Sequence, residues 1–461
     1  MEYESFLKQK FKDAPRVGHD DEPQQHGLLP HQRDLVRWAV GQGRAAIFAD
    51  TGLGKSRMQV EWSRMVGQAT GQRVLILAPL AVAAQTVREG AAIGVHVHHA
   101  KSDAEARGGI CVTNYDRLHL FDPKRFGAVV LDESSCIKNF DSKTLSTLKD
   151  AFAHCRYRLA CTATPAPNDF VELGTHAEFL GVCSRAEMLA EFFVHDSGKT
   201  QDWRLKKHAR ADFWKWVACW AALVRRPSDL GYADEGYDLP QLDVRDHVVG
   251  VTAADFEGAG VPYIELAATL TERRWARKAS LRARVAAAAE LVAREPDEQW
   301  LLWGDFNAET EGAASAIPGA VEVRGPDDPD EKAERLLAFA EGRLRVLVSK
   351  PSIAGWGMNF QRCARQVFIG MSDSFEMTYQ AIRRSWRFGQ RRPVHVHMLS
   401  SAPEGAVVDN VRRKEADARA MADELSRETR DAVRANVRGR QRRHNPYEPA
   451  RPMRLPGFMN R

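Results

Sequence analysis

The sequence lacks several features that would assign it to a membrane or secreted class. It has no run of about 18 apolar residues, which a membrane-spanning helix needs, and its first residues, MEYESFLKQKFKD, are too charged for a secretory signal. Its seven cysteines are scattered and none forms a C-x-x-C pair. We therefore expect a cytoplasmic protein with no membrane partner and reduced thiols, although Cys155 and Cys161 lie close enough in sequence to bridge.

Acidic residues are scarce at the C-terminus. The net charge is +5, but the segment 434–461 has eight arginines and one acid, which leaves −2 for the rest of the chain. This segment contains several prolines and few periodic apolar positions, so we expect it to be largely disordered. A solubilising tail and a tail that contacts phosphates both fit this composition, because cations near a polyanion release its counterions.

Short apolar runs alternate with segments of helix length twice along the chain, which is too long for one core. Such runs are typical of buried parallel strands. The expected strands are 45–48, 74–79, 110–113, 128–132 and 158–162 in the first half, and 300–303, 321–323, 345–349, 366–370 and 394–399 in the second. This alternation predicts two α/β domains, each with a doubly wound parallel sheet.

The stretch between the two domains has aromatic and charged residues at helical spacing. In DFWKWVACWAALVRR (212–226), Trp214, Val217 and Trp220 share a helix face, which we interpret as a core stripe rather than a nucleic-acid stacking platform. The expected organisation is an N-terminal extension 1–26, a first domain 27–175, a helical insert and linker 176–285, a second domain 286–405, and a helical then disordered basic tail 406–461.

A phosphate-loop signature in the first domain lacks one glycine. ADTGLGKSR (49–57) follows an expected strand and precedes an amphipathic segment, but Ala49 stands where the pattern G-x-x-x-x-G-K-[ST] begins. In such a loop, N–H groups at a helix N-terminus bind phosphates, the lysine reaches the β and γ phosphates, and the hydroxyl ligates Mg²⁺. The predicted nucleotide-binding residues are Thr51, Gly52, Gly54, Lys55 and Ser56.

Two adjacent acids end an apolar strand in VVLDESS (129–135). The carboxyl edge of a parallel sheet is where open α/β folds bind ligands. There Asp132 is positioned to hold Mg²⁺, and Glu133 to orient and deprotonate the water that attacks the γ-phosphate. An acidic pair at a strand end is often only a solvated loop start. Downstream of a phosphate loop it indicates nucleotide hydrolysis.

Small hydroxylated residues follow another strand in RLACTATPAPND (158–169). Thr162 and Thr164 would couple the acidic pair to the opposite domain by exchanging hydrogen-bond partners. The alternative is a plain strand-to-loop junction, because Thr-Ala-Thr-Pro is also common turn chemistry.

In the second domain, SDSFEMTYQAIRRSWRFGQ (372–390) predicts a helix with a capping box at Asp373 and Glu376 and a C-cap at Gly389. On one face of that helix would lie Gln380, Arg384 and Arg387. Arginine forks directed at a γ-phosphate across a domain gap form an arginine-finger arrangement. A surface helix with salt bridges is the alternative for an isolated segment, but here another domain supplies a phosphate site.

Taken in order, these motifs resemble the superfamily-two helicases, specifically the Swi/Snf-type branch of double-stranded DNA translocases, over about residues 27–400. LLPHQ resembles the adenine-reading segment, with Gln32 as its glutamine, and the family's phosphate loop commonly lacks the first glycine. LDESSCIKN resembles the DEAH-type box, except that Ser134 and Ser135 replace Ala-His. Further matches are VLILAPLAVAAQTV (74–87) and ICVTNYDRL (110–118) to the DNA-contacting motifs, CTATPAPND to the coupling motif, 223–244 to the interdomain segment, and 349–371 and 379–399 to the fifth and sixth motifs.

The resemblance implies two RecA-like domains that hydrolyse ATP with Mg²⁺ to move along DNA. ATP would bind between Gln32 and the loop, Ser56 and Asp132 would hold the metal, and Arg384 and Arg387 would complete the site when the domains close. Duplex DNA with little sequence preference is the expected partner, because motor contacts are mostly to phosphates. The residues expected to contact the track are Thr113, Asn114, Tyr115, Gly355, Gly357 and Asn359.

The compact size suggests a bacterial or phage protein, with any protein partners in replication or recombination. Strand separation would need a wedge, for which Trp356 and the 185–225 stretch are candidates. Two alternatives stay open. One is a nucleotide-gated DNA clamp with weak ATPase activity, which the Ser134-Ser135 substitution favours, and the other is an RNA helicase.

Overall fold

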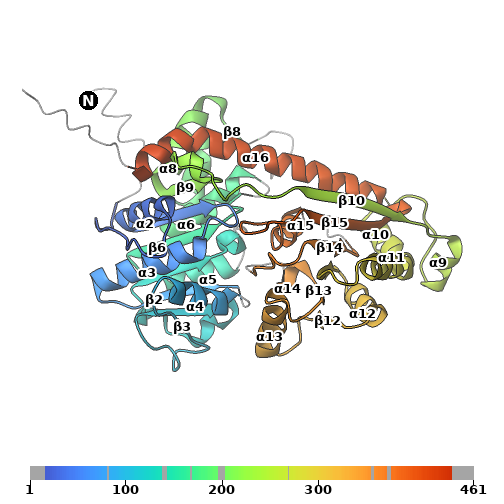
Figure 1. Cartoon of the computed structure of the whole chain (residues 1–461). Coiled ribbons are helices and arrows are strands. Elements are labelled where there is room, and N and C mark those ends of the chain that lie inside the picture. The colour runs from blue at the N-terminus through green and yellow to red at the C-terminus, as the bar shows by residue number, and fades with distance from the viewer. Residues whose placement is uncertain are drawn as a thin grey trace, which may run out of the picture.

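The computed structural model describes residues 16–79, 82–137, 143–166, 169–195, 203–267, 269–354, 358–370 and 375–438. Two parallel-sheet domains with flanking helices lie side by side, and a long C-terminal helix runs along both of them (Figure 1). The predicted fold class is therefore confirmed. All seven cysteines are free thiols, as expected from their spacing.

The first domain contains a seven-stranded sheet in the order β3-β4-β2-β5-β6-β1-β9, with every neighbouring pair parallel. Its strands are β1 (Arg44–Ala49), β2 (Val74–Ala78), β3 (His98–His99), β4 (Ile110–Asn114), β5 (Ala128–Asp132), β6 (Tyr157–Thr162) and β9 (Ala221–Val224). The strands β2, β4, β5 and β6 are buried along their whole length. Helices on both faces cause this burial, which is why the strands read as continuous apolar runs.

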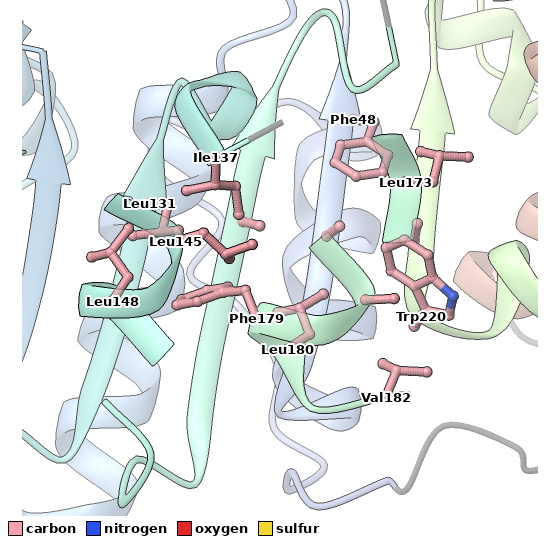
Figure 2. Close-up of a cluster of buried hydrophobic side chains, with 14 of the residues drawn as sticks. Phe48, Leu131, Ile137, Leu145, Leu148, Leu173, Phe179, Leu180, Val182 and Trp220 are labelled. Atoms are coloured by element: carbon pink, nitrogen blue, oxygen red, sulfur yellow. The ribbon is translucent and has the colours of Figure 1, made fainter. Parts of the chain in front are cut away.

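The helices of the first domain are α2 (Pro30–Gln42), α3 (Lys55–Thr70), α4 (Ala83–Ala92), α5 (Lys143–Ala151), α6 (Leu173–Leu180), α7 (Arg185–Phe192) and α8 (Arg210–Trp220), and a short hairpin joins β7 (Phe193–His195) to β8 (Trp203–Leu205). Figure 2 shows the core on one face of the sheet, where side chains of α5 and α6 and Trp220 of α8 pack against Phe48 and Leu131. Trp214, Val217 and Trp220 are all buried, so the predicted core stripe is confirmed.

The second domain contains a six-stranded parallel sheet in the order β10-β15-β14-β11-β13-β12. Its strands are β10 (Leu242–Val249), β11 (Trp300–Trp303), β12 (Ala320–Val323), β13 (Val346–Ser349), β14 (Arg365–Phe368) and β15 (Val394–Ser401). The helices that follow the first domain are α9 (Ala253–Gly258), α10 (Leu270–Ala279), α11 (Leu281–Arg294), α12 (Asn307–Ala316), α13 (Pro329–Ala340), α14 (Pro351–Ala354), α15 (Phe375–Ile382) and α16 (Gly405–Arg438).

All ten predicted strands are present, and the stretch 176–285 adds strands to both sheets. It supplies β9 to the first sheet and β10 to the second, where β10 is an edge strand paired with β15. The stretch expected to be a helical insert is therefore part of both sheets.

The predicted helix in the second domain is shorter than expected. It ends at Ile382, and Gly389 has a positive φ of 91° in a turn rather than at a helix C-cap. The Arg387 N–H bonds to the Ser385 carbonyl at 3.1 Å, and the Arg384 carbonyl accepts from the Phe360 N–H at 2.9 Å, so helical bonding does not continue. Asp373 and the side chain of Glu376 lie outside the described residues.

The helix α16 connects the two domains and corrects the predicted start of the disordered tail. It begins after β15 and packs against α8, β9 and α2 of the first domain (Figure 1). There Val433 and Val437 are buried, and Asn436 Nδ2 donates to the Ala218 carbonyl at 2.9 Å. Residues 434–438 are therefore helical, and 439–461 lie outside the described residues. In the described part of the chain, no helix combines the length and apolarity that crossing a membrane requires.

Candidate functional site

The phosphate loop connects β1 to α3 and requires glycine at two positions. Gly52 and Gly54 have φ values of 93° and 83°, a region that side chains with a Cβ rarely adopt. A Cβ on Gly54 would lie 2.3 Å from Gln32 Nε2, and one on Gly52 would lie 2.6 Å from Phe388 Cβ. The loop is thus enclosed by Gln32 of its own domain and by Phe388 of the second domain.

Ala49 fits the first position of the loop because it ends the strand β1. Its φ is not positive, so the position does not need glycine. Its carbonyl accepts from Lys55 Nζ at 2.8 Å, and the Asp50 carbonyl accepts at 3.4 Å. Burial lowers the pKa of Lys55, while the nearby carboxylates of Glu133 and Asp132 oppose this shift. The ammonium is therefore held within the loop, among acidic neighbours.

The acidic pair lies at the end of β5, beside the loop. Asp132 Oδ1 accepts from Gln59 Nε2 at 2.7 Å and from the Glu133 N–H at 3.0 Å. Burial, followed by the neighbouring Glu133, raises the pKa of Asp132 to about 6. Glu133 has a φ of 53° and is the one non-glycine residue with positive φ in the described ranges. Strain of this kind costs about 1–3 kcal/mol and clusters at functional sites.

A chain of hydrogen bonds joins Glu133 to the second domain through the predicted coupling residues. Thr162 Oγ1 donates to Glu133 Oε1 at 3.2 Å, and the Thr164 N–H donates to Thr162 Oγ1 at 3.1 Å. Gln380 Nε2 crosses the domain gap to Thr164 Oγ1 at 3.2 Å, and its Oε1 accepts from Arg384 Nη2 at 2.7 Å. These bonds form a contiguous path from the acidic pair to Arg384.

Two arginines of the second domain lie at the site and form no ion pair with a described residue. Arg384 Nε donates to the Gln380 carbonyl at 2.9 Å, and Arg387 Nη1 donates to the Met358 carbonyl at 3.1 Å. Within the described residues, neither forms an ion pair, and Arg387 Nε is buried without a hydrogen-bond partner. Burial, followed by the charge of Arg384, lowers the pKa of Arg387 to about 9. Buried charges are normally paired, so this pair indicates a site for an anion.

A cavity of about 200 Å³ brings these groups together. It accommodates the phosphate part of a nucleotide, because pockets for whole ligands measure about 300–1,000 Å³. Its lining includes Leu29, Gln32, Thr51, Gly52, Gly54, Lys55, Ser56, Asp132, Glu133, Tyr237, Asn359, Gln361, Arg384, Arg387 and Phe388. The structure thus gathers the predicted loop residues, both acids and both arginines around one space.

Gln32 holds the loop in position. Its Nε2 donates to the Leu53 carbonyl at 3.0 Å, and its Oε1 accepts from the Leu29 N–H at 2.9 Å. Beside it, the rings of Tyr237 and Phe388 stack with centroids 4.6 Å apart at the cavity lining. These side chains from the interdomain segment and the second domain provide an aromatic surface that the sequence did not indicate.

Two of the residues predicted to contact the track, Tyr115 and Asn359, lie at this site. Thr113 is fully buried, and Asn114 Oδ1 accepts from the Arg117 N–H at 3.0 Å, which caps a 3₁₀ helix. Tyr115 donates its hydroxyl to the Asp132 carbonyl at 2.7 Å, and Asn359 lines the cavity. Their contact with nucleic acid stays a prediction, and Gly355 and Gly357 lie outside the described residues.

Two further interactions were missed from the sequence. Arg383 Nη2 donates to Asp50 Oδ1 at 2.7 Å, across the domain gap. Ser134 Oγ and His176 Nε2 are 3.1 Å apart, both fully buried, and burial lowers the pKa of His176 to about 4. Arg383 could have been found as the arginine next to Arg384. His176 is a lone histidine in the short helix α6 and gave no signal.

Mg²⁺ would be held by Ser56 and Asp132 together with phosphate oxygens. The oxygens of a hydroxyl and a carboxylate are the ligands that this cation prefers, and it commonly takes few protein ligands beside a nucleotide. In the part of the chain that the structure describes, no cluster of three or more His, Cys, Asp or Glu residues could hold a metal on its own. The donor set therefore fits a metal that arrives with its nucleotide.

The chain was compared with known families, curated proteins and solved structures. No protein-family profile matches it. A Sulfolobus solfataricus SWI2/SNF2 ATPase core in complex with dsDNA aligns with 91% of this chain and 99% of that chain, at 17% identity and a TM-score of 0.41. Curated relatives include the bifunctional helicase and thymine dioxygenase JBP2 of Leishmania infantum, Leishmania tarentolae and Leishmania major.

Each of these relatives is 36% identical over 87 residues, which is 19% of this chain and 8% of the relative. The chain therefore matches less than a tenth of their length. The helicase name of these relatives agrees with the helicase resemblance of the motifs.

Proposed function

We propose that the protein hydrolyses ATP between its two domains and uses the resulting motion to translocate along duplex DNA. The observation that carries the ATPase part is the pair Arg384 and Arg387, which form no ion pair with any described residue and line a cavity together with Lys55, Asp132 and Glu133. Cations from two domains around one phosphate-sized space can stabilise the negative charge on a phosphoryl group in its transition state.

Each residue has a defined role in this proposal. The loop amides and Lys55 bind the β and γ phosphates, Glu133 accepts a proton from the attacking water, and the two arginines stabilise the charge that develops on the γ-phosphoryl. Ser56 and Asp132 would hold Mg²⁺, which would supply positive charge against the phosphates. Thr162, Thr164 and Gln380 link the general base to the second domain, so hydrolysis and domain movement are coupled.

Duplex DNA as the partner is supported by the resemblance of the motifs and by the helicase name of the relatives. The six arginines within 439–461 would add phosphate contacts without sequence preference. Translocation without strand separation follows from the Swi/Snf-type resemblance. Displacement of a third strand from a triplex, without unwinding of a fork, is the result that distinguishes this motor from a helicase.

The direct test is ATPase turnover with and without duplex DNA, in the wild type and in Glu133→Gln. The expected result is stimulation by duplex DNA and loss of turnover in the variant, with retained ATP binding because Glu133 is not a phosphate ligand. Arg392→Met is a suitable control, since Arg392 lies on the surface and pairs with Glu298 at 2.9 Å. If ATPase turnover were equal with and without DNA, the protein would be a nucleotide hydrolase and not a DNA motor.

A nucleotide-gated clamp with weak hydrolysis is the second candidate. Ser134 and Ser135 are buried, and Ser134 bonds to His176 of its own domain rather than to the second domain. The bonds through Thr164 and Gln380 supply that connection instead, which favours the motor. A turnover that DNA does not change, combined with DNA affinity that depends on ATP, would support the clamp.

A further inference from the structure

Arg383 joins the second domain to the rear of the phosphate loop. Its guanidinium donates to Asp50 Oδ1 at 2.7 Å and to the Thr51 hydroxyl, and it is only 5% exposed. Burial lowers the pKa of Arg383, but the charge of Asp50 opposes this and the net shift is upward, so the guanidinium stays charged. The contact is therefore an ion pair between domains, made to the loop itself.

The ion pair and the two unpaired arginines lie on opposite sides of the loop. Asp50 and Arg383 line a cavity of about 930 Å³ between the domains, whereas Arg384 and Arg387 line the smaller cavity with Lys55. Thr51 lines both, so it marks the wall between them. A phosphate bound at the front would not displace a guanidinium at the rear.

The segment that follows α15 thus holds the loop from both sides. Arg383 and Arg384 are neighbours in sequence, so fixing one guanidinium against Asp50 restricts where the next can lie. The close approach of Phe388 Cβ to Gly52 adds a second contact on the same segment. Since a misplacement of about 1 Å can cost about 100-fold in rate, such an anchor matters for arginines that act at a phosphate.

We infer that Arg383 is a positioning residue, which anchors the second domain on Asp50 and thereby places Arg384 and Arg387 at the phosphate cavity. The effect of this anchoring on the rate of ATP hydrolysis rests on the proposed ATPase function. The anchoring itself is a property of the nucleotide-free protein and can be measured without catalysis.

The test compares Arg383→Met, Asp50→Asn and the double variant. Hydrogen exchange of the amides of residues 51–54 is measured without nucleotide, and kcat and KM for ATP are measured with duplex DNA. Both single variants should exchange at least about tenfold faster in the loop, because each leaves a buried charge unpaired. They should also lose about 100-fold in kcat with a much smaller change in KM.

The double variant should be no slower than the worse single variant, because the two residues act as one unit. Lys101→Met and Asp330→Asn are matched controls, since this ion pair also joins the two domains, at 2.7 Å, but is exposed. These controls should leave loop exchange and kcat unchanged. Arg383→Lys keeps the charge, so it should fold and retain most of the loop protection if Arg383→Met does not fold.

The inference would be overturned if the loop of every Arg383 and Asp50 variant exchanged at the wild-type rate. It would also be overturned if the losses in kcat multiplied in the double variant. If the wild type does not hydrolyse ATP, the proposed function fails, and the exchange arm still decides whether Arg383 anchors the domains.

Discussion

Removing the charge of Arg387 should stabilise the nucleotide-free protein and abolish its ATPase activity. The guanidinium has no counterion among the described residues, and its Nε is buried without a partner. The lowering of its pKa to about 9 corresponds to about 5 kcal/mol, at about 1.36 kcal/mol per pH unit. The residue is only partly buried, so solvent screening reduces this penalty to about 1–2 kcal/mol.

Arg387→Met keeps an unbranched side chain but removes the guanidinium and its charge. At about 2–4 °C per kcal/mol for a domain of 150–250 residues, Tm should rise by a few degrees. A base with a lowered folded pKa destabilises the protein fully below that pKa and progressively less above it. The gain should therefore be constant from about pH 6 to pH 8, where the guanidinium is charged in both the folded and the unfolded protein.

The assay is thermal unfolding of the wild type, Arg387→Met and the surface control Arg392→Met, each with and without pyrophosphate. Pyrophosphate should raise Tm of the wild type and of the control more than that of Arg387→Met, because binding to the folded state adds stability. A lower Tm for Arg387→Met, or an equal response to pyrophosphate in all three proteins, would refute the claim that an anion site requires this charge.

Three further predictions concern pH, the serine-histidine pair and the tail. Stability should fall as the pH drops from 6.5 to 4, because burial holds the pKa values of three histidines at about 4 and the unfolded chain therefore binds protons first; these are His31, His176 and His397. Asp132, with its pKa of about 6, acts in the opposite direction. Urea unfolding as a function of pH measures this, and His176→Leu should flatten the acid slope; an unchanged slope would contradict it. Ser134→Ala leaves buried His176 Nε2 without its partner and should cost about 1–3 kcal/mol in the same urea assay, whereas the double variant Ser134→Ala with His176→Leu should recover part of that loss; additive losses would show that the pair does not interact. Truncation after Arg438 preserves α16, and it should reduce the slope of log DNA affinity against log salt by about 0.9 for each arginine that contacts phosphate; an identical slope would leave 439–461 as a solubilising segment.

Nine of the ten predicted strands have apolar side chains on both faces, as buried parallel strands require, whereas 321–323 has Glu322 on one face. The strand β9 was missed because AALV continues an aromatic helical pattern without a break. The strand β10, LDVRDHVV, was missed because it lies at a sheet edge and carries charges, and only its pairing with β15 makes it a strand.

The site residues that lie in the phosphate loop or at the end of a strand could be predicted from the sequence. Lys55, Asp132 and Glu133 follow from short motifs whose local geometry is fixed by the sheet. Contacts between the domains were not predictable in the same way. The sequence indicated no role for Arg383, because its contact with Asp50 joins residues 333 positions apart across the domain gap.

The most direct test of the account is ATPase turnover of the wild type and Glu133→Gln with duplex DNA, single-stranded DNA and duplex RNA. A duplex DNA motor should hydrolyse ATP in the wild type, with more stimulation by duplex DNA than by single-stranded DNA or duplex RNA. Glu133→Gln should bind ATP without turnover. Turnover that no nucleic acid changes, or that survives in Glu133→Gln, would contradict this account.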